Sequence, residues 1–341
     1  MQKPFAALSQ RAQVQCMRRL AQDALAAYTV PVARMTLLKH VYNTTFRITT
    51  PSGEQYVLRI CHPRRTAVDL VQSELLWLAA LRQAVGVNVP EPVLNQQQQY
   101  VTVVADPRLP APRLCVLFHW TYGRFASQTL TPVHLLQVGE FTAHLHHHAA
   151  QWERPPGFTR RRIDNLNPLC QEQDNGFTES AAAAAIQAIL AVSTPQVGSV
   201  VAGVIEKVWA LLKALGEGSD SFGLIHADLH QRNYLFHNGQ AGAIDFDDCG
   251  FGHWLYDLAV TLYCLNGHSN FAALKEAFLT GYRRHRPLST EQEAQLGVFM
   301  ALRTLQDLLW VLTERDQPAF RDRWQTQMRA AFQSLEAFIQ S

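Results

Sequence analysis

The feature of this sequence that most constrains its fold is the separation of strand patterns from helix patterns along the chain. Short runs rich in β-branched and aromatic residues occupy residues 34–42, 44–50 and 55–60, and a Pro-Ser-Gly turn separates the last two. Beyond residue 130 most segments have the apolar spacing of helices. The pattern predicts an α+β fold with an antiparallel sheet in its first part and a mostly helical second part.

The length of the chain predicts two lobes. At 341 residues it exceeds the size that one hydrophobic core usually reaches. The first lobe, residues 1–118, would begin with an amphipathic helix over 1–28 and carry a second helix over about 66–83. A hinge at 119–124 would connect it to a second lobe over 125–341. Further strands are expected near residues 99–105 and 113–119, a helix over about 132–149, and a helix that ends at Gly216.

The composition excludes several classes of protein. Hydrophobic residues make up 48% and charged residues 17%, which is typical of a soluble enzyme and not of a disordered or fibrous chain. With 30 Lys+Arg against 28 Asp+Glu, the formal net charge of +2 indicates neither a nucleic acid nor a membrane surface as partner. The absence of a signal-peptide pattern predicts a cytoplasmic protein. The six cysteines lack CxxC spacing, which predicts free thiols: Cys16, Cys61, Cys115, Cys170, Cys249 and Cys264.

A polar stretch, HADLHQRN at residues 226–233, contains groups suited to phosphoryl transfer. That reaction needs a carboxylate that orients an attacking hydroxyl group, and Asp228 suits this task. It also needs oxygen ligands for magnesium, and Asn233 and Asp245 can supply an amide and a carboxylate oxygen. Asp245 follows Asp228 by 17 residues, and the predicted hairpin around Asn238-Gly239 would return the chain to its starting place.

The two motifs HADLHQRN and AIDFDD together resemble those of the aminoglycoside phosphotransferase and choline kinase-like family. The longer segments IHADLHQRNYLF, AIDFDDCGFGHWLYDLA and WERPPGFTR are similar to those of bacterial relatives grouped with homoserine kinase type II and stress-response kinases. The resemblance covers roughly residues 30–310. It implies a protein-kinase-like two-lobed fold that uses ATP and magnesium to phosphorylate a hydroxyl group.

The resemblance also implies roles for individual residues. Asp228 would be the catalytic base, and Asn233 and Asp245 would bind magnesium. His226 would support the loop, and Asp257 would brace it from below. Asp247 is expected beside the site, where it could assist the metal or cap a turn.

In the first lobe, the family's phosphate-contacting cation falls on Arg59 and its glutamate partner on Glu74. Glu74 lies on an apolar helical stripe, where a carboxylate is costly unless it is paired, and this favours the pair independently. The family's usual lysine is here an arginine, which is not interchangeable at a phosphate site. The loop before the second strand has no glycine, so Asn43, Thr44 and Thr45 are expected to supply donors to the nucleotide phosphates instead.

Several patterns have competing interpretations. His226, Asp228 and His230 could be read as transition-metal ligands, but Asn233 and Asp245 would then be coincidences. A helix whose histidines face water or polar neighbours is favoured over a metal site for His144, His146, His147 and His148. A solvated basic turn is favoured over an anion-binding site for Arg160, Arg161 and Arg162. Thr290 and Glu293 form a capping-box pattern before a long helix.

The sequence thus predicts an ATP- and magnesium-dependent phosphotransferase with a small hydroxyl-bearing acceptor, for which an amino-acid alcohol such as homoserine is one candidate. Residues 130–210 show no acidic excess, which argues against a polycationic antibiotic as acceptor. Two alternatives remain open: a protein Ser/Thr kinase of the stress-response type, and a nucleotide-binding pseudokinase. The second is motivated by Arg59 and by the glycine-free loop.

Overall fold

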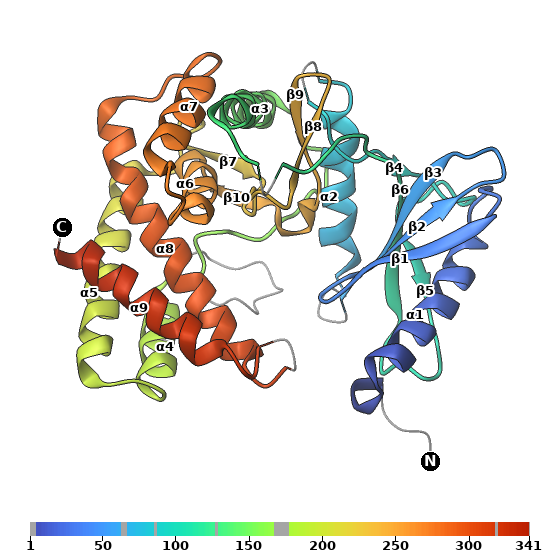
Figure 1. The fold of residues 1–341 in the computed structure, drawn as a ribbon, viewed down its shortest axis with the longest axis horizontal. Helices are drawn as coiled ribbons and strands as arrows, with labels where there is room; N and C mark the ends of the chain where they lie inside the picture. The colour runs from blue at the N-terminus through green and yellow to red at the C-terminus, as the bar shows by residue number, and fades with distance from the viewer. Residues whose placement is uncertain are drawn as a thin grey trace. The chain divides into compact units, whose positions relative to one another are not determined.

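The computed structural model describes residues 5–62, 67–84, 87–126, 129–166, 177–317 and 320–340 (Figure 1). The chain forms two compact units. The first consists of Met1–Tyr122 and Pro155–Thr159, and the second of Gly123–Arg154 and Arg160–Ser341. The α+β prediction is confirmed, because the first unit contains an antiparallel sheet and the second is mostly helical.

The first unit is built on one antiparallel sheet with the order β1-β2-β3-β6-β4, and β5 pairs with β6. The predicted meander of the first three strands is confirmed, with strand bounds close to those expected. The strands are β1 (Arg34–His40), β2 (Thr44–Thr49), β3 (Gln55–Ile60), β4 (Pro92–Val93), β5 (Thr102–Val104) and β6 (Arg113–His119).

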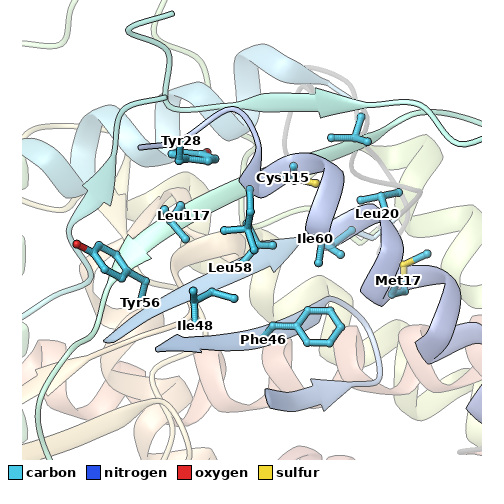
Figure 2. Packing of buried hydrophobic residues seen from close by; sticks show 14 of the residues in the cluster. Met17, Leu20, Tyr28, Phe46, Ile48, Tyr56, Leu58, Ile60, Cys115 and Leu117 are labelled. Carbon is cyan, nitrogen blue, oxygen red and sulfur yellow. The ribbon is translucent and has the colours of Figure 1, made fainter. Parts of the chain in front are cut away.

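One face of this sheet is covered by helix α1 (Gln10–Leu25) (Figure 2). Since side chains alternate along a strand, Phe46 of β2 and its partner Leu58 of β3 point to the same face, where they are fully buried. The helix contributes a stripe of apolar side chains to the same core: Met17, Leu20, Ala21, Ala24 and Leu25. The predicted helix over 1–28 is too long, because Ser9 caps α1 and a 3₁₀ turn over Phe5–Ala7 precedes it.

Helix α2 (Val68–Leu81) also belongs to the first unit. Its buried residues include Trp77 and Leu78, and also the charged Glu74, which lies on the same side of the helix. Glu74 meets Arg59, whose position in β3 alternates with that of the α1-facing Leu58. The two helices therefore contact side chains that leave the sheet on opposite faces.

The second unit is mostly helical and contains two small sheets. Its helices are α3 (Pro132–Gln151), α4 (Glu179–Leu190), α5 (Pro195–Leu215), α6 (Trp254–Leu265), α7 (Phe271–Arg283), α8 (Thr290–Glu314) and α9 (Trp324–Gln340). One sheet pairs β7 (Phe222–Ile225) with β10 (Gly250–His253), and the other pairs β8 (Tyr234–His237) with β9 (Gln240–Ala243). The predicted hairpin is confirmed, because Asn238 and Gly239 take positive φ angles of 49° and 76° in its turn.

Two helix-end predictions have different outcomes. Gly216 ends α5 with a φ of 61°, as predicted. The capping box of α8 is shifted by one residue from the predicted pair. The hydroxyl of Ser289 accepts from the N–H of Gln292, and Oε1 of Gln292 accepts from the N–H of Ser289. Thr290 is therefore the first helical residue and not the cap.

Helix α8 is the one helix, among the residues that the structure describes, that is long and apolar enough to cross a membrane by length and composition. Its apolar side chains pack against α5, α6 and α9 in the second unit. The described cysteines are free, with Cys61, Cys115 and Cys249 buried and Cys16 and Cys264 half-buried. Cys170 lies outside the described residues.

Helices α3 and α7 lie side by side, and their backbones are in direct contact (Figure 1). A Cβ atom at Gly281 of α7 would lie 2.0 Å from the carbonyl oxygen of Leu136, and one at Gly139 of α3 would lie 2.0 Å from that of Phe278. No side chain can rotate away to relieve such an overlap, since the atoms involved belong to the backbone. Glycine is required at both positions for this approach.

We expect Gly281→Ala to lower the free energy of unfolding by about 1–3 kcal/mol, the usual cost of overpacking a core. Gly297→Ala on α8 is the matched control, because its Cβ would meet Phe338 at an ordinary 3.9 Å. That control should raise stability by about 0.5–1 kcal/mol through helix propensity. Urea denaturation of both variants measures the difference. Equal stability of the two would contradict the close helix contact.

Candidate active site

The loop that follows β7 brings Asp228 and Asn233 into direct contact. The side-chain amide nitrogen of Asn233 donates to Oδ2 of Asp228 at 3.1 Å and to its main-chain oxygen at 2.9 Å. Asn233 is buried, and 20% of the Asp228 side chain is exposed. Because the amide nitrogen faces Asp228, the amide oxygen is the atom of Asn233 that a metal ion would take as a ligand.

Asp245 is joined to this loop through the residue before it. The N–H of Ile244 donates to the carbonyl oxygen of Asn233 at 2.8 Å, and its own carbonyl oxygen lies 3.1 Å from Nε2 of His226. Strand β9 ends at Ala243, so the hairpin returns the chain to the loop two residues before Asp245. Asp245 itself is half-buried and has a left-handed backbone with a φ of 67°. The structure thus brings the three sequence-predicted residues to one edge of the hairpin.

His226 supports the loop from inside the unit. Its Nδ1 accepts from the N–H of Asp228 at 3.3 Å, so its Nε2 carries the proton that is donated to Ile244. Burial lowers the pKa of His226, which keeps the ring neutral. A neutral ring with both nitrogens bonded to main-chain atoms joins the loop to the hairpin and has no role as a metal ligand in this geometry.

Asp257 holds the first two residues of the loop by their backbone. Its Oδ2 accepts from the N–H of His226 at 3.0 Å and its Oδ1 from the N–H of Ala227 at 2.8 Å. Ala227 has a φ of 67°, a strained value for a residue with a side chain, and the bond from its N–H helps to maintain it. Burial alone would raise the pKa of Asp257, but hydrogen bonds from His146 and the loop lower it below its ordinary value.

His146 of α3 completes this brace, which the sequence analysis missed. Its Nε2 lies 3.1 Å from Oδ2 of Asp257 and its Nδ1 3.0 Å from the hydroxyl of Tyr282 on α7. The expectation that the histidines of this helix face water or polar neighbours holds for His146, which is fully buried and faces the polar groups of Asp257 and Tyr282. His144 instead packs against the ring of His285. Within the described ranges no group of three or more His, Cys, Asp or Glu could hold a metal ion.

Arg303 of α8 is a second group that the sequence analysis missed. Its Nη2 donates to Oδ1 of Asp228 at 2.9 Å. Burial raises the pKa of Asp228 to about 7, and the positive charge of Arg303 opposes that rise. Burial, aided by the charges of Arg232 and Arg303, lowers the pKa of His230 to about 4, so this ring is neutral beside Asp228. An arginine between the apolar residues Leu302 and Leu305 of a long helix was the available signal.

The three consecutive arginines do not form the solvated basic turn that was favoured. Arg160 is buried, and its guanidinium donates to the carbonyl oxygens of Cys249 at 2.6 Å and Asp247 at 2.8 Å. It thus holds the segment that follows Asp245. Arg161 pairs with Asp248, and Arg162 pairs with the buried Asp164.

In the first unit, Arg59 and Glu74 form the expected buried pair. The guanidinium donates two parallel bonds to the carboxylate, at 2.7 and 2.8 Å, and Phe118 lies under it. Arg59 is 5% and Glu74 1% exposed, so the two-bond pair compensates charges that are both buried.

The neighbouring polar residues have different surroundings. Oδ1 of Asn43 accepts from the N–H of His62 at 2.9 Å, and the hydroxyl of Thr44 lies 2.8 Å from Nδ1 of His40. These two side chains therefore stabilise the first unit. Thr45 is half-buried and stands opposite Arg59 in the β2–β3 register, which places the two side chains on the same face of the sheet.

Comparisons with known proteins identify the family of this chain. The sequence matches the model of the phosphotransferase enzyme family over residues 34–288, which is more than half of the chain. The chain belongs to this family. It is 27% identical to a homoserine kinase of Gluconobacter oxydans over 290 residues, which are 81% of this chain and 82% of that protein.

Solved structures with the same fold include an amicoumacin kinase, hAmiN, in complex with AMP-PNP, Ca2+ and Ami. It has a TM-score of 0.77 and 21% identity and covers 96% of both chains. A microcompartment-associated aminopropanol kinase has a TM-score of 0.70 and 26% identity, over 94% of this chain and 95% of that one. The predicted protein-kinase-like fold is therefore confirmed. The chain is a phosphotransferase with an alcohol group as acceptor.

We expect Glu74→Leu to lower the free energy of unfolding by about 3–5 kcal/mol, because it removes the carboxylate that accepts two bonds from the buried Arg59 guanidinium. The double variant Arg59→Met with Glu74→Leu should recover most of this loss, since it buries no charge. The exposed pair of Arg284 with Glu140 offers the control. Arg284→Met should cost at most about 1 kcal/mol. A double variant as unstable as Glu74→Leu alone, in urea denaturation, would contradict this account.

Asp257→Asn should lower both the stability of the protein and its turnover rate. An amide has one acceptor oxygen where the carboxylate has two, so one loop N–H stays buried without a partner at a cost of about 1–3 kcal/mol. The displaced loop should lower the turnover rate as well. Asp220→Asn, at an exposed position, should change neither quantity. Denaturation and rate assays on the same preparations test this, and a stable, fully active Asp257→Asn protein would refute the brace.

Proposed function

We propose that this chain is an ATP- and magnesium-dependent kinase that phosphorylates the hydroxyl group of a small amino alcohol in the cytoplasm. The observation that carries the proposal is the contact of Asn233 with Asp228, together with the backbone bond that attaches the residue before Asp245 to Asn233. The site then combines one carboxylate that can act as a base with two oxygen ligands for a metal ion, which are the groups that phosphoryl transfer requires.

The amide oxygen of Asn233 and the carboxylate of Asp245 fit magnesium, which prefers a few hard oxygen ligands and completes its shell with phosphate oxygens and water. When bound, the metal supplies positive charge to the phosphate groups of ATP. Asp228 orients the acceptor hydroxyl and takes its proton as the oxygen–phosphorus bond forms and the bond to ADP breaks. With a pKa of about 7, this carboxylate is suited to exchange a proton near neutral pH.

Arg59 and Thr45 are the first-unit residues that we assign to the nucleotide phosphates. Arg59 contributes a fixed positive charge held by Glu74, and Thr45 adds a hydroxyl on the same face of the sheet. The side chains of Asn43 and Thr44 bond to His62 and His40, and we assign the contribution of these two residues to the phosphates to their main-chain groups.

A small amino alcohol is the acceptor class that the relatives favour. One relative is named a homoserine kinase and one structural neighbour an aminopropanol kinase, and both names denote a hydroxyl group close to an amine. These two matches cover more than four fifths of both partners, so most of this chain has a counterpart in each.

We expect ADP release from ATP and magnesium to depend on L-homoserine or on aminopropanol, and not on propylamine, which lacks the hydroxyl. Asp228→Asn should lower kcat by roughly 10²–10⁴-fold with little change in nucleotide binding, because the base is lost while the metal ligands remain. Asp316→Asn, at an exposed position between α8 and α9, is the control.

An Asp228→Asn protein as fast as the unmodified one would exclude this mechanism. Binding of ATP without transfer to any hydroxyl compound would instead identify a pseudokinase. Transfer of labelled phosphate to proteins alone would identify a protein kinase.

A further inference from the structure

The catalytic carboxylate is restrained on both of its oxygens by groups from different elements. Oδ2 accepts from Asn233, five residues along the same loop, and Oδ1 accepts from Arg303 of α8 at 2.9 Å. A carboxylate bonded on one oxygen can still rotate about its axis. Bonds on both oxygens fix the plane of the group and so the direction in which its remaining lone pairs point.

Arg303 also holds the residue before the catalytic one. Its Nη1 lies 3.2 Å from the carbonyl oxygen of Ala227 and donates to it. The N–H of Ala227 is bonded to Asp257 of α6, so this strained residue is held at its N–H by one helix and at its carbonyl by another. The planar fork of a guanidinium can bond to both the Ala227 carbonyl and the Asp228 carboxylate, whereas a lysine ammonium has no such fixed spacing.

Arg303 is itself anchored within the second unit. Its Nε lies 3.1 Å from Oδ1 of Asp307, one helical turn further along α8, and 20% of its side chain is exposed. This ion pair places the guanidinium charge beside the loop before any substrate binds. Positioning of this kind costs little when the reaction occurs, because it is already present in the folded protein.

We propose that Arg303 is a positioning residue for phosphoryl transfer, which sets the orientation of the Asp228 carboxylate toward the acceptor hydroxyl. The inference rests on the proposed function, because its kinetic test measures the proposed phosphoryl transfer. It concerns α8, which lies outside both sequence motifs and beyond the segment that matches the family model. It assigns no substrate contact to Arg303, which acts through Asp228 and the carbonyl of Ala227.

The kinetic experiment compares Arg303→Ala, Arg303→Lys and Asp307→Asn with the unmodified protein, using ATP, magnesium and L-homoserine or aminopropanol. We expect Arg303→Ala to lower kcat roughly a hundredfold, the effect of a misplaced catalytic group, with the KM for ATP nearly unchanged. Arg303→Lys should recover only a small part of the rate, and Asp307→Asn should lose less than either. Arg284→Ala, which removes an exposed arginine of similar size from the end of α7, should behave as the unmodified protein does.

Chemical rescue separates positioning from general stabilisation of the fold. Millimolar guanidinium should raise the rate of Arg303→Ala several-fold by occupying the vacated space beside Asp307 and Asp228, whereas tetramethylammonium at the same concentration should not. A rate that guanidinium cannot restore, in a protein whose unfolding midpoint has fallen, would show a merely structural role and overturn the inference. An unchanged kcat in Arg303→Ala would overturn it as well.

Hydrogen exchange tests the same inference without any substrate. Amides of residues 226–233 should exchange faster in Arg303→Ala than in the unmodified protein or in Arg284→Ala, because the loop has lost its bond to α8. If the unmodified protein transfers phosphate to neither acceptor, the proposed function fails, and this measurement alone decides the inference. Equal exchange in all three proteins would then refute the positioning role.

Discussion

The loop that carries Asp228 and Asn233 depends on one buried carboxylate that accepts hydrogen bonds from the backbone. Asp257 binds the N–H groups of His226 and Ala227, and without it the strained backbone of Ala227 would relax toward an ordinary conformation. Thr261, one turn further along α6, donates to the carbonyl oxygen of Leu229 and extends the same attachment. The helix therefore supports the loop along one face, since residues four apart in a helix point in the same direction.

The second constraint is the short hairpin, which explains how few residues suffice to assemble the site. Its Asn-Gly turn reverses the chain. The bond from the N–H of Ile244 to the carbonyl of Asn233 then attaches the residue before Asp245 to the loop. The proposed metal ligands are thus positioned by backbone hydrogen bonds, which are less adaptable than side-chain contacts. Arg160 stabilises the other side by binding the carbonyl oxygens of Asp247 and Cys249.

Patterns that are local in the sequence predicted much of this arrangement. The meander, the hairpin, the Glu74 pair and the polar loop follow from alternation, turn residues and the cost of an unpaired buried charge. The contributions of His146, Arg160 and Arg303 could not be predicted, because each reaches the site from a distant part of the chain. Tertiary packing decides whether such a residue is buried or solvated, and this outcome cannot be predicted from a short stretch of sequence. The N-terminal cap of α8 was mispredicted by one residue because serine and threonine are both good caps.

The contact between α3 and α7 limits how this site can be moved to another protein. Since Gly139 and Gly281 set the two backbones against each other, His146 and Tyr282 keep a fixed separation, and His146 in turn fixes Asp257. Transplanting only the loop and hairpin into a new scaffold would leave the carboxylate of Asp257 without its partner. A functional graft would have to include α3 together with α6 and α7, which lie more than 100 residues further along the chain, so most of the second unit would have to move with the loop.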